Sequence, residues 1–321
     1  MPALPNRSVL VALPAKCALL CVLALSVAGF FGTLHRWPEL ASHFKVQYML
    51  ASAACAVFFA ALKRWRWALL ALACVLLNGA FLLPLYLPAP GGDGGNARRR
   101  VSLLLANVNV ANADYDALLR LAREESPDIV ILQEATPAWA AATTPLRDAL
   151  PHALVEARPD PFGLVVYSRF PLDRAESVTL GAARVTAVVA RVRVNGAAFS
   201  LVTAHVYPPL PGFYEGRNEQ LEELASLAAR AERPVVLAGD LNASSWSPYF
   251  RKFERASGLR DARRGFGVLP TWPTYRPVMY IPIDHYLVSP EIKVTRLSTG
   301  AQIGSDHLPV ITTVEIPEPS R

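Results

Sequence analysis

The chain has 321 residues, of which 52% are hydrophobic, and it carries a formal net charge of +6. Residues 1–100 hold ten Lys and Arg against two acids, which leaves 22 basic and 24 acidic residues in 101–321 from the totals of 32 and 26, a net charge of −2. Because domains that grip nucleic acid by bulk charge are strongly basic, residues 101–321 do not have the composition of such a domain.

Three apolar runs occupy the first part of the chain, at residues 9–34, 46–62 and 67–87. A helix needs about 20 mainly apolar residues to cross the core of a bilayer, and each run comes near that length. A cleaved signal peptide would explain the first run alone, but two further runs follow it directly. We therefore predict a three-span transmembrane anchor over residues 1–87. All four cysteines lie in these runs, so the rest of the chain needs no disulfide.

The short turn between the second and third runs contains Lys63, Arg64 and Arg66. The positive-inside rule places this turn in the cytoplasm, and residues 88–321 then lie outside the cytoplasmic (inner) membrane of a multi-pass protein. Arg98, Arg99 and Arg100 favour the opposite orientation, but they belong to a Pro/Gly/Arg-rich linker predicted over 88–100. A catalytic domain is expected over residues 101–321.

Beyond the linker, short apolar runs rich in β-branched residues stop repeatedly at a polar residue. The first such strand runs into Asn107, a helix is predicted over 114–125, and the next strand stops at Glu134. A strand is also expected in "FGLVVYSRFPL". Asn195-Gly196 predicts a tight hairpin, whose second strand ends at His205.

The same pattern continues to the end of the chain. A helix predicted over 214–231 leads into "PVVLAGDLN", a strand that ends in Asp240 and Asn242. Two more strands are expected in "YIPIDHYLVS", which contains Asp284, and after "GSDH" at 304–307. Strands, hairpins and two clear helices favour a mixed sheet or two packed sheets over a doubly wound parallel sheet.

The polar residues that end these strands are oxygen donors and imidazoles, with no thiolate among them. They are Asn107, Glu134, His205, Asp240, Asn242, Asp306 and His307. Such a set suits a hard cation such as Mg²⁺, or Mn²⁺, and does not suit structural zinc. We expect Glu134 and Asp306 to hold the metal, with Asn107 supplying a neutral amide oxygen.

Hydrolysis of a phosphate ester needs a cation, an oriented water and a group that manages the leaving oxygen. Asp240 is expected to orient and deprotonate the water, and Asn242 to donate to a phosphoryl oxygen. His307 is the candidate general acid and base, with its tautomer fixed by a second carboxylate such as Asp284.

Each of these residues also has a purely structural interpretation. A single histidine at a strand end is usually a surface residue, Asp240 and Asn242 could form an Asx-turn, and Glu134 could lie in a solvated loop. The combination favours function, because five strands deliver complementary groups. For the basic residues of 251–264 we favour a solvated helix face over contact with phosphate or lipid headgroups, and for "TWPTY" (271–275) a packed loop over a substrate wall.

The order of these motifs resembles the endonuclease/exonuclease/phosphatase superfamily, which is DNase I-like. The resemblance rests on Asn107 after a strand and on "LQE", "TAH", "GDLN", "IDHYLVS" and "SDH", and it extends over about residues 101–315. The "PTWP…IPIDH" wording and the preceding apolar runs look like a bacterial membrane-anchored branch, some of whose members act on polyprenyl pyrophosphates.

The resemblance implies a four-layer α/β sandwich of two mixed β-sheets flanked by helices. It implies that Glu134 is the principal Mg²⁺ ligand, that His205 stabilises the transition state, and that Asp284 pairs with His307. Two positions depart from the family pattern. Leu241 replaces a frequent aromatic residue, and Pro282 stands where many nucleases carry Arg, which argues against DNA as the substrate.

We therefore expect a membrane-anchored, Mg²⁺-dependent phosphoesterase acting on a lipid or polyprenyl (pyro)phosphate at the outer face of the cytoplasmic membrane. One alternative is an extracytoplasmic nuclease, for which nucleic acid would be the partner. Another is a catalytically inactive binding or sensor protein. Retention of Asn107, Glu134, Asp240, Asn242 and His307 argues against an inactive protein.

Overall fold

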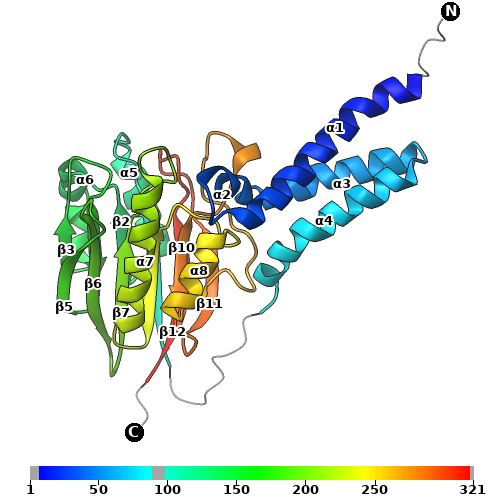
Figure 1. The fold of residues 1–321 in the computed structure, drawn as a ribbon. Coiled ribbons are helices and arrows are strands. Elements are labelled where there is room, and N and C mark those ends of the chain that lie inside the picture. The colour runs from blue at the N-terminus through cyan, green and yellow to red at the C-terminus, as the bar shows by residue number, and fades with distance from the viewer. Residues whose placement is uncertain (1–6, 89–97, 319–321) are drawn as a thin grey trace, which may run out of the picture. The chain divides into compact units, whose positions relative to one another are not determined.

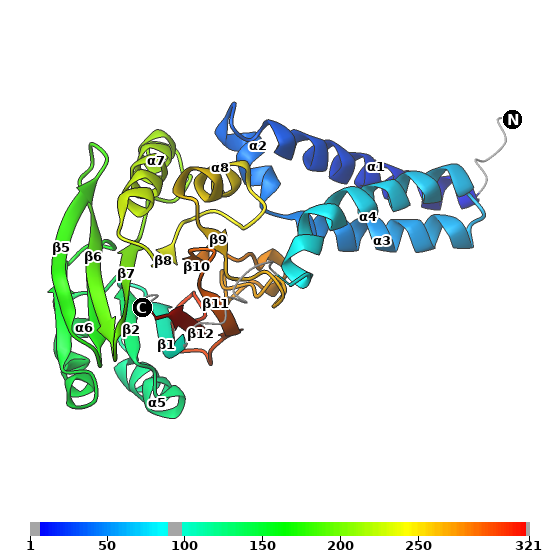
Figure 2. The same ribbon diagram turned by 90° about the horizontal axis from the view of Figure 1, so that it is seen from below.

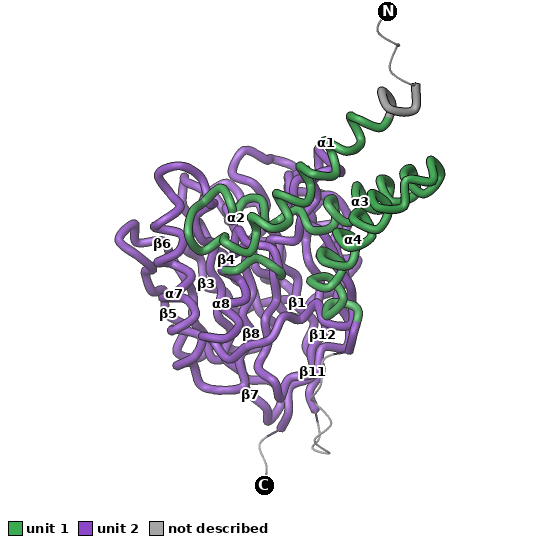
Figure 3. Tube along the Cα trace, turned by 45° about the vertical axis from the view of Figure 1, so that its right-hand side comes forward, with its two compact units in different colours: residues 1–86, 246–248 green, residues 87–245, 249–321 purple. Residues whose placement is uncertain are grey.

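The structure, a computed structural model, describes residues 7–88 and 98–318. The chain divides into two compact units (Figure 3). One comprises residues 1–86 and 246–248, and the other residues 87–245 and 249–321. The predicted linker over 88–100 falls largely outside the described residues, at 89–97. Its last three residues, Arg98–Arg100, already belong to the first strand of the second unit.

The first unit is helical (Figure 1). Its helices are α1 (Arg7–Ala28), η1 (Gly29–Phe31), α2 (Arg36–Ser42), α3 (Lys45–Ala61) and α4 (Trp65–Tyr86). Two helical stretches, Ala12–Phe31 and Trp65–Tyr86, are long and apolar enough to cross a membrane. The predicted third span is shown only if α2 and α3, which are bent by 64° at their junction, count as one span. With 17 residues, α3 lies at the short end of the range for a spanning helix.

Lys45 links three helices of this unit. Its ammonium group donates to the carbonyl of Ser26 (3.0 Å) in the last turn of α1, where the helix dipole is negative. The same group faces the rings of Phe30 and Phe81 at 5.3 and 4.8 Å from their centroids. These contacts give the buried cation partners without a carboxylate.

The second unit is built on two six-stranded sheets. The first sheet has the order β11-β12-β1-β2-β4-β3, and the second has the order β5-β6-β7-β8-β10-β9. The strands of the first sheet are β1 (Arg98–Asn107), β2 (Ile129–Gln133), β3 (His152–Glu156), β4 (Leu164–Ser168), β11 (Lys293–Thr299) and β12 (Val310–Pro317). The strands of the second are β5 (Leu172–Leu180), β6 (Val185–Val194), β7 (Ala197–Ala204), β8 (Val235–Asp240), β9 (Arg260–Asp261) and β10 (Asp284–Val288).

Both faces of the central strands are buried, and for this reason the strands read as continuous apolar runs in the sequence. Along β1, Leu103 and Leu105 point into a core shared by the two sheets, whereas Leu104 and Ala106 point to the opposite face. Four helices cover the outer faces, which produces four layers (Figure 2). They are α5 (Tyr115–Glu125) and α6 (Pro137–Ala142) on the first sheet, and α7 (Tyr214–Arg230) and α8 (Pro248–Ser257) on the second.

The predicted helices and hairpin have clear local causes. The Asp114 side chain caps α5 by accepting from the amide of Ala117 (3.1 Å). Asn195 (φ 44°) and Gly196 (φ 94°) join β6 to β7 in the left-handed conformation that a two-residue hairpin turn requires. The helix face favoured for the basic residues of 251–264 is present only as far as Ser257, where α8 ends. The short helix α6 was not predicted, and neither were the 3₁₀ helices η2 (Thr144–Asp148) and η3 (Pro277–Met279).

Gly239 is required where β7 and β8 lie side by side. A Cβ at this position would come within 2.1 Å of the carbonyl oxygen of Ala204. Gly239→Ala should therefore force the two parallel strands apart and lower the free energy of unfolding by about 1–3 kcal/mol. Thermal unfolding of the full-length protein measures this change.

The matched control is Gly216→Ala. Gly216 lies in α7, where a Cβ would make only ordinary contact with the Tyr207 ring at 3.5 Å. Because alanine favours the helix over glycine by up to about 1 kcal/mol, this variant should be as stable as the wild type or more so. Equal melting temperatures for both variants would contradict the packing argument.

Candidate active site

The directions of the strands bring the predicted residues to one edge of the second unit. β1 runs parallel to β2, and β7 runs parallel to β8, so these four strands end together. β10 is antiparallel to β8, and β12 is antiparallel to β1, so these two strands start where the others end. The residues assembled at this edge are Asn107, Glu134, His205, Asp240, Asn242, Asp284, Asp306 and His307.

Asn107, Glu134 and Asp306 form an oxygen-rich cluster with a fourth residue, Asn109. The Asn107 side-chain amide donates to Glu134 Oε1 (3.0 Å), and the Val110 backbone amide donates to Glu134 Oε2 (2.9 Å). Asn109 donates through its backbone amide to Asn107 Oδ1 (3.1 Å) and through its side chain to Asp306 Oδ1 (2.6 Å). The three metal ligands expected from the sequence are thus neighbours, connected through Asn109.

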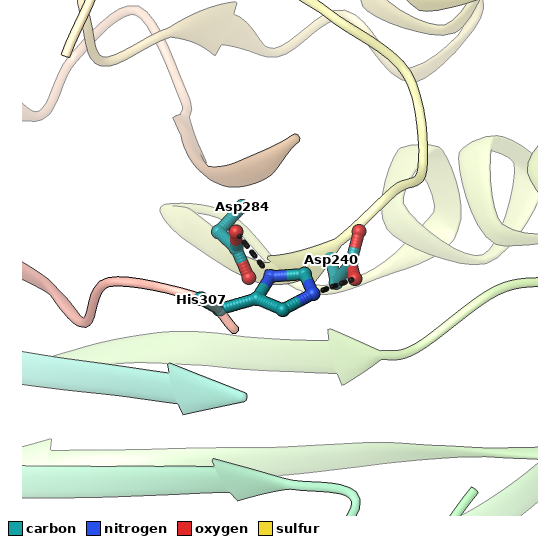
Figure 4. A group of neighbouring side chains, drawn as sticks. All are labelled: Asp240, Asp284 and His307. Carbon is teal, nitrogen blue, oxygen red and sulfur yellow. Dashed lines mark hydrogen bonds and ion pairs between the residues drawn. The ribbon is translucent and has the colours of Figure 1, made fainter. Parts of the chain in front are cut away.

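Asp240 and Asp284 face each other directly. They are register partners on the antiparallel strands β8 and β10, and both are buried. Two buried carboxylates that face each other on adjacent strands repel each other. His307 lies between them (Figure 4), with Nδ1 2.9 Å from Asp284 Oδ2 and Nε2 3.8 Å from Asp240 Oδ2.

Burial and charge set different pKa values in this trio. Burial raises the pKa of Asp284, but the charge and hydrogen bond of His307 outweigh burial and the net shift is downward. Burial lowers the pKa of His307, but the charge and hydrogen bond of Asp284 prevail and raise it to about 10. Burial and the Asp284 charge raise the pKa of Asp240 to about 6. At neutral pH the ring therefore carries a proton on each nitrogen, between two ionised carboxylates.

Asp240 Oδ2 is the point where several donors converge. His205 Nε2 lies 3.5 Å from it, and the Asn107 side-chain amide lies 3.4 Å from it. Asn242 donates its backbone amide to Asp240 Oδ1 (2.8 Å), and its side-chain nitrogen lies 3.5 Å from His205 Nε2. His205 Nδ1 lies 2.9 Å from the carbonyl of Pro161, an acceptor that holds the ring with Nε2 toward Asp240.

Gln133 joins the two sheets beneath these residues. Its side-chain nitrogen donates to the carbonyl of Ala204 at the end of β7 (2.7 Å), and its oxygen accepts from the amide of Asp240 (2.9 Å). This one buried side chain from the first sheet therefore fixes the positions of two strands of the second. Gln133 was not predicted as a site residue, although "LQE" contained it.

Trp272 and Asn109 were also missed by the sequence interpretation. The indole of Trp272 donates to Asp306 Oδ2 (3.0 Å), and its ring centroid lies 6.4 Å from that of His307. The "TWPTY" segment is thus a packed loop that also touches the site. No local pattern singles out Asn109, which lies beyond the end of β1 and was included only in the quoted run "VSLLLANVNV".

Three residues of the site adopt the left-handed backbone region that few non-glycine residues occupy. They are Asn109 (φ 61°), Glu134 (φ 57°) and Asn242 (φ 48°). Each comes one or two residues after a strand end, where the chain turns sharply and aims a side chain at the edge. Such strained residues persist where the surrounding contacts hold them, and they concentrate at functional sites.

The donor set fits a divalent cation. Glu134, Asp306 and Asn107 offer carboxylate and amide oxygens, the ligands that Mg²⁺ takes in proteins. A second group also has metal-binding spacing, because one potential ligand atom from each of Asp240, Asp284 and His307 lies within 4.8 Å of the others. Both ring nitrogens of His307 face carboxylates of that group, Nδ1 toward Asp284 and Nε2 toward Asp240.

Two packed mixed sheets with carboxylates, amides and imidazoles gathered at one edge define a metal-dependent hydrolase of phosphate esters. The model of the Endonuclease/Exonuclease/phosphatase family matches residues 104–307, and the chain belongs to this family. This membership confirms that the protein is an enzyme that acts on phosphate ester bonds with the help of a divalent metal ion.

Solved structures share the fold at low sequence identity. TDP2 of D. rerio, complexed with a single-strand DNA product, is 18% identical, with a TM-score of 0.59 over 67% of this chain and 98% of that chain. An endonuclease/exonuclease/phosphatase from Beutenbergia cavernae is 20% identical, with a TM-score of 0.55 over 70% and 74% of the chains. Sphingomyelinase C from Streptomyces griseocarneus is 18% identical, with a TM-score of 0.50 over 67% and 99%. No curated protein matches the chain.

Proposed function

We propose that this enzyme hydrolyses a membrane-embedded phosphoester, a lipid or polyprenyl (pyro)phosphate, at the outer face of the cytoplasmic membrane. The observation that carries this proposal is the covalent connection between two apolar helices and the catalytic unit. Eleven residues separate Tyr86 from Arg98, and an extended chain of that length spans at most about 40 Å. If α4 crosses the membrane, the catalytic unit never leaves the vicinity of lipid headgroups.

Exposed apolar side chains on two loops beside the site support a lipid substrate. Leu210 (50% exposed) and Phe213 (44%) follow His205, and a series of ring contacts connects Phe213 through Tyr207 and Phe162 to His205, with centroids 4.9–5.5 Å apart. Leu210 and Phe213 lie in the segment between β7 and α7. Apolar groups at the mouth of a phosphate-binding site suit a substrate whose phosphate is joined to hydrocarbon.

The second loop follows Trp272. Tyr275 is 64% exposed and Val278 is 81% exposed. The loop is held to the site because the Thr274 amide donates to the carbonyl of Asp306 (2.9 Å). The net charge of −2 over residues 101–321 and Pro282 in the place of the nuclease arginine also favour a lipid over DNA.

In this proposal Glu134, Asp306 and Asn107 hold Mg²⁺, which would neutralise charge on the phosphoryl oxygens. With its pKa raised to about 6, Asp240 is ionised at neutral pH and basic enough to take a proton from water. His307, protonated and held by Asp284, then supplies positive charge where negative charge grows, and His205 supplies a hydrogen bond there. Asn242 positions a phosphoryl oxygen.

The orientation across the membrane belongs to the same proposal. Lys63, Arg64 and Arg66 cluster around the turn between α3 and α4. With this turn in the cytoplasm, the carboxyl end of α4 and the catalytic unit after it face the exterior. We also propose a division into an anchor (1–87), a linker that begins at 88, and a catalytic domain whose first strand β1 starts at Arg98.

Product analysis tests the proposed substrate class, with inorganic phosphate, released phosphomonoesters and shortened oligonucleotides each measured. The full-length protein in lipid nanodiscs with Mg²⁺ would receive polyprenyl pyrophosphate, a phospholipid, and single- and double-stranded DNA, each with an EDTA control. We expect metal-dependent turnover confined to the lipid substrates. Cleavage of DNA in preference to the lipids would overturn the lipid proposal and favour an extracytoplasmic nuclease.

The exposed loops give a sharper test. Replacing Phe213 and Val278 together by serine should lower kcat/KM for a bilayer-embedded substrate by about a hundredfold. Burying two such side chains at a bilayer surface contributes on the order of 1.5–3 kcal/mol each, most of which the substitutions remove when both insert. Turnover of the water-soluble ester p-nitrophenyl phosphate should not change.

The matched control is Val155→Ser. Val155 is 41% exposed, like Phe213, but it lies on β3, away from the two loops. This variant should behave as the wild type with both substrates. Equal losses with soluble and embedded substrates in the double variant would show that the loops act on catalysis and not on lipid access.

A further inference from the structure

Arg263 is a fully buried cation two residues beyond β9, with an exposed fraction of 0%. The sequence interpretation placed it on a solvated helix face together with its basic neighbours, and for Arg263 this was wrong. α8 ends at Ser257, and the chain then turns inward. A guanidinium group is buried at this depth only where partners satisfy its donors.

The hydrogen bonds of this guanidinium go to acceptors on segments of the site. Nε donates to the carbonyl of Val268 (3.0 Å), Nη1 to His285 Nδ1 (2.8 Å), and Nη2 to the carbonyl of Asp284 (2.6 Å). A weaker bond joins Nη2 to the carbonyl of Leu269 (3.4 Å). Arg263 itself is held by its backbone amide, which donates to Asp261 Oδ1 (2.9 Å).

His285 continues the network to the next loop. Because Nδ1 accepts from Arg263, the proton of the neutral ring is on Nε2, which donates to the carbonyl of Ala243 (2.7 Å). Burial and then the Arg263 charge keep the pKa of His285 well below its ordinary value, so the ring stays neutral and can accept. Ala243 directly follows Asn242, which lies beside Asp240.

The guanidinium therefore holds three segments that carry site residues. These are β10 with Asp284, the segment 268–269 leading to Trp272, and, through His285, the turn after Asn242. A lysine could not do this, because its single ammonium group lacks the planar fork of five donors. Neither phosphate nor solvent can reach Arg263.

We propose that Arg263 is a positioning residue, which through its bonds to the Asp284 carbonyl and to His285 fixes Asp284 in the orientation that holds His307. It touches neither substrate nor metal. The proposal rests on phosphoester hydrolysis by this site and not on the lipid nature of the substrate. It also explains why a cation is retained in a core that hydrophobic residues would otherwise fill.

Steady-state kinetics with bis(p-nitrophenyl) phosphate and p-nitrophenyl phosphate, at saturating Mg²⁺, test the proposal on the full-length protein in detergent. Arg263→Lys should lower kcat by about 10- to 100-fold, as loss of orienting partners does, with KM changed less than about twofold. The matched control is Arg264→Lys, since Arg264 is the adjacent arginine and pairs with Glu254 at 3.3 Å on the surface. That variant should behave as the wild type.

A double-mutant cycle separates positioning from general stability. If Arg263 acts through Asp284, Arg263→Lys should cost little once Asp284→Asn is present. Equal fold losses in the two backgrounds would overturn the proposal. If Arg263→Lys does not fold, His285→Leu takes its place in the cycle, because this variant removes one acceptor and leaves Arg263 in place. The loss of kcat caused by His285→Leu should vanish in the Asp284→Asn background in the same way.

A spectroscopic measurement decides the question even without turnover of the soluble esters. In histidine-labelled protein, the Nδ1 proton of His307, bonded to Asp284, should give a low-field resonance that Asp284→Asn removes. Arg263→Lys should shift or broaden this resonance, and Arg264→Lys should not. A folded Arg263→Lys protein with an unchanged resonance would refute the positioning role, whatever the substrate of the enzyme proves to be.

Discussion

Replacing His307 by alanine should lower kcat by about 100- to 10,000-fold, the contribution that a positioned acid or base makes to a hydrolysis. The ring occupies the space between Asp240 and Asp284, with its nitrogens 3.8 and 2.9 Å from their oxygens. Without the ring, two buried carboxylates face each other across β8 and β10, and one of them must take up a proton. The variant loses both the imidazolium charge and one of the two ionised carboxylates.

The measurement is phosphate release by the full-length protein with Mg²⁺, together with a melting curve that shows whether the catalytic unit is folded. His152→Ala is the matched control, because His152 starts β3 and belongs to no contact of the site. Asp284→Asn should approach the loss seen for His307→Ala, and the double variant should lose little more, since the two residues act as a pair. Retention of wild-type turnover by folded His307→Ala would refute the assignment.

Removal of the divalent cation should abolish turnover, and Glu134→Gln should reduce it by about a thousandfold. The metal contributes several kcal/mol of charge stabilisation, and glutamine keeps the shape of Glu134 but not its charge. Glu134 is held in a left-handed conformation (φ 57°), with each oxygen accepting one hydrogen bond. Its remaining lone pairs are free to bind a cation, so its loss should weaken the cation site directly.

Binding of Mn²⁺ followed by electron paramagnetic resonance gives a readout that does not depend on activity. Glu134→Gln should weaken Mn²⁺ binding, whereas Glu156→Gln, on β3, should not change it. If Asp284→Asn abolishes binding and Glu134→Gln leaves it intact, the cation belongs to the trio of Asp240, Asp284 and His307, whose spacing also suits a metal. That result would assign the metal to Asp240, Asp284 and His307 instead of to Glu134, Asp306 and Asn107.

The strand ends could be predicted because the central strands are buried on both faces. Such strands are mostly apolar, so the polar residues that follow each run mark the point where the strand leaves the core. Asn107, Glu134, His205 and Asp240 were identified in this way, and the structure places them at one edge. The outer strand β5 was not predicted, since most of its residues are exposed and its sequence is polar.

The contacts within the site could not be predicted from the sequence. The pairing of Asp240 with Asp284 depends on the register of β10 against β8, which no local pattern specifies. Asn109 and Trp272 reach Asp306 only because distant segments fold together. Arginine is usually a surface residue, and Arg263 is buried only because the chain turns inward after α8. No local sequence pattern predicts that path.

The third membrane span also shows that composition alone does not decide whether a short apolar run crosses a membrane. A run of 17 apolar residues is equally consistent with a short span and with a helix that needs a bent partner to reach full length. Length and hydropathy identify helices of 20 or more residues reliably, which is why Ala12–Phe31 and Trp65–Tyr86 meet both criteria.

The pairing of the last strand with the first sets the moment at which the enzyme becomes active. β12 lies beside β1 in the first sheet, and Asp306 and His307 come just before β12. A nascent chain therefore cannot complete its reactive centre until residues 306–317 have been synthesised and β12 has paired with β1. Fragments released by interrupted synthesis or by proteolysis near the C-terminus would be unable to hydrolyse phosphate esters, which restricts the activity to intact molecules.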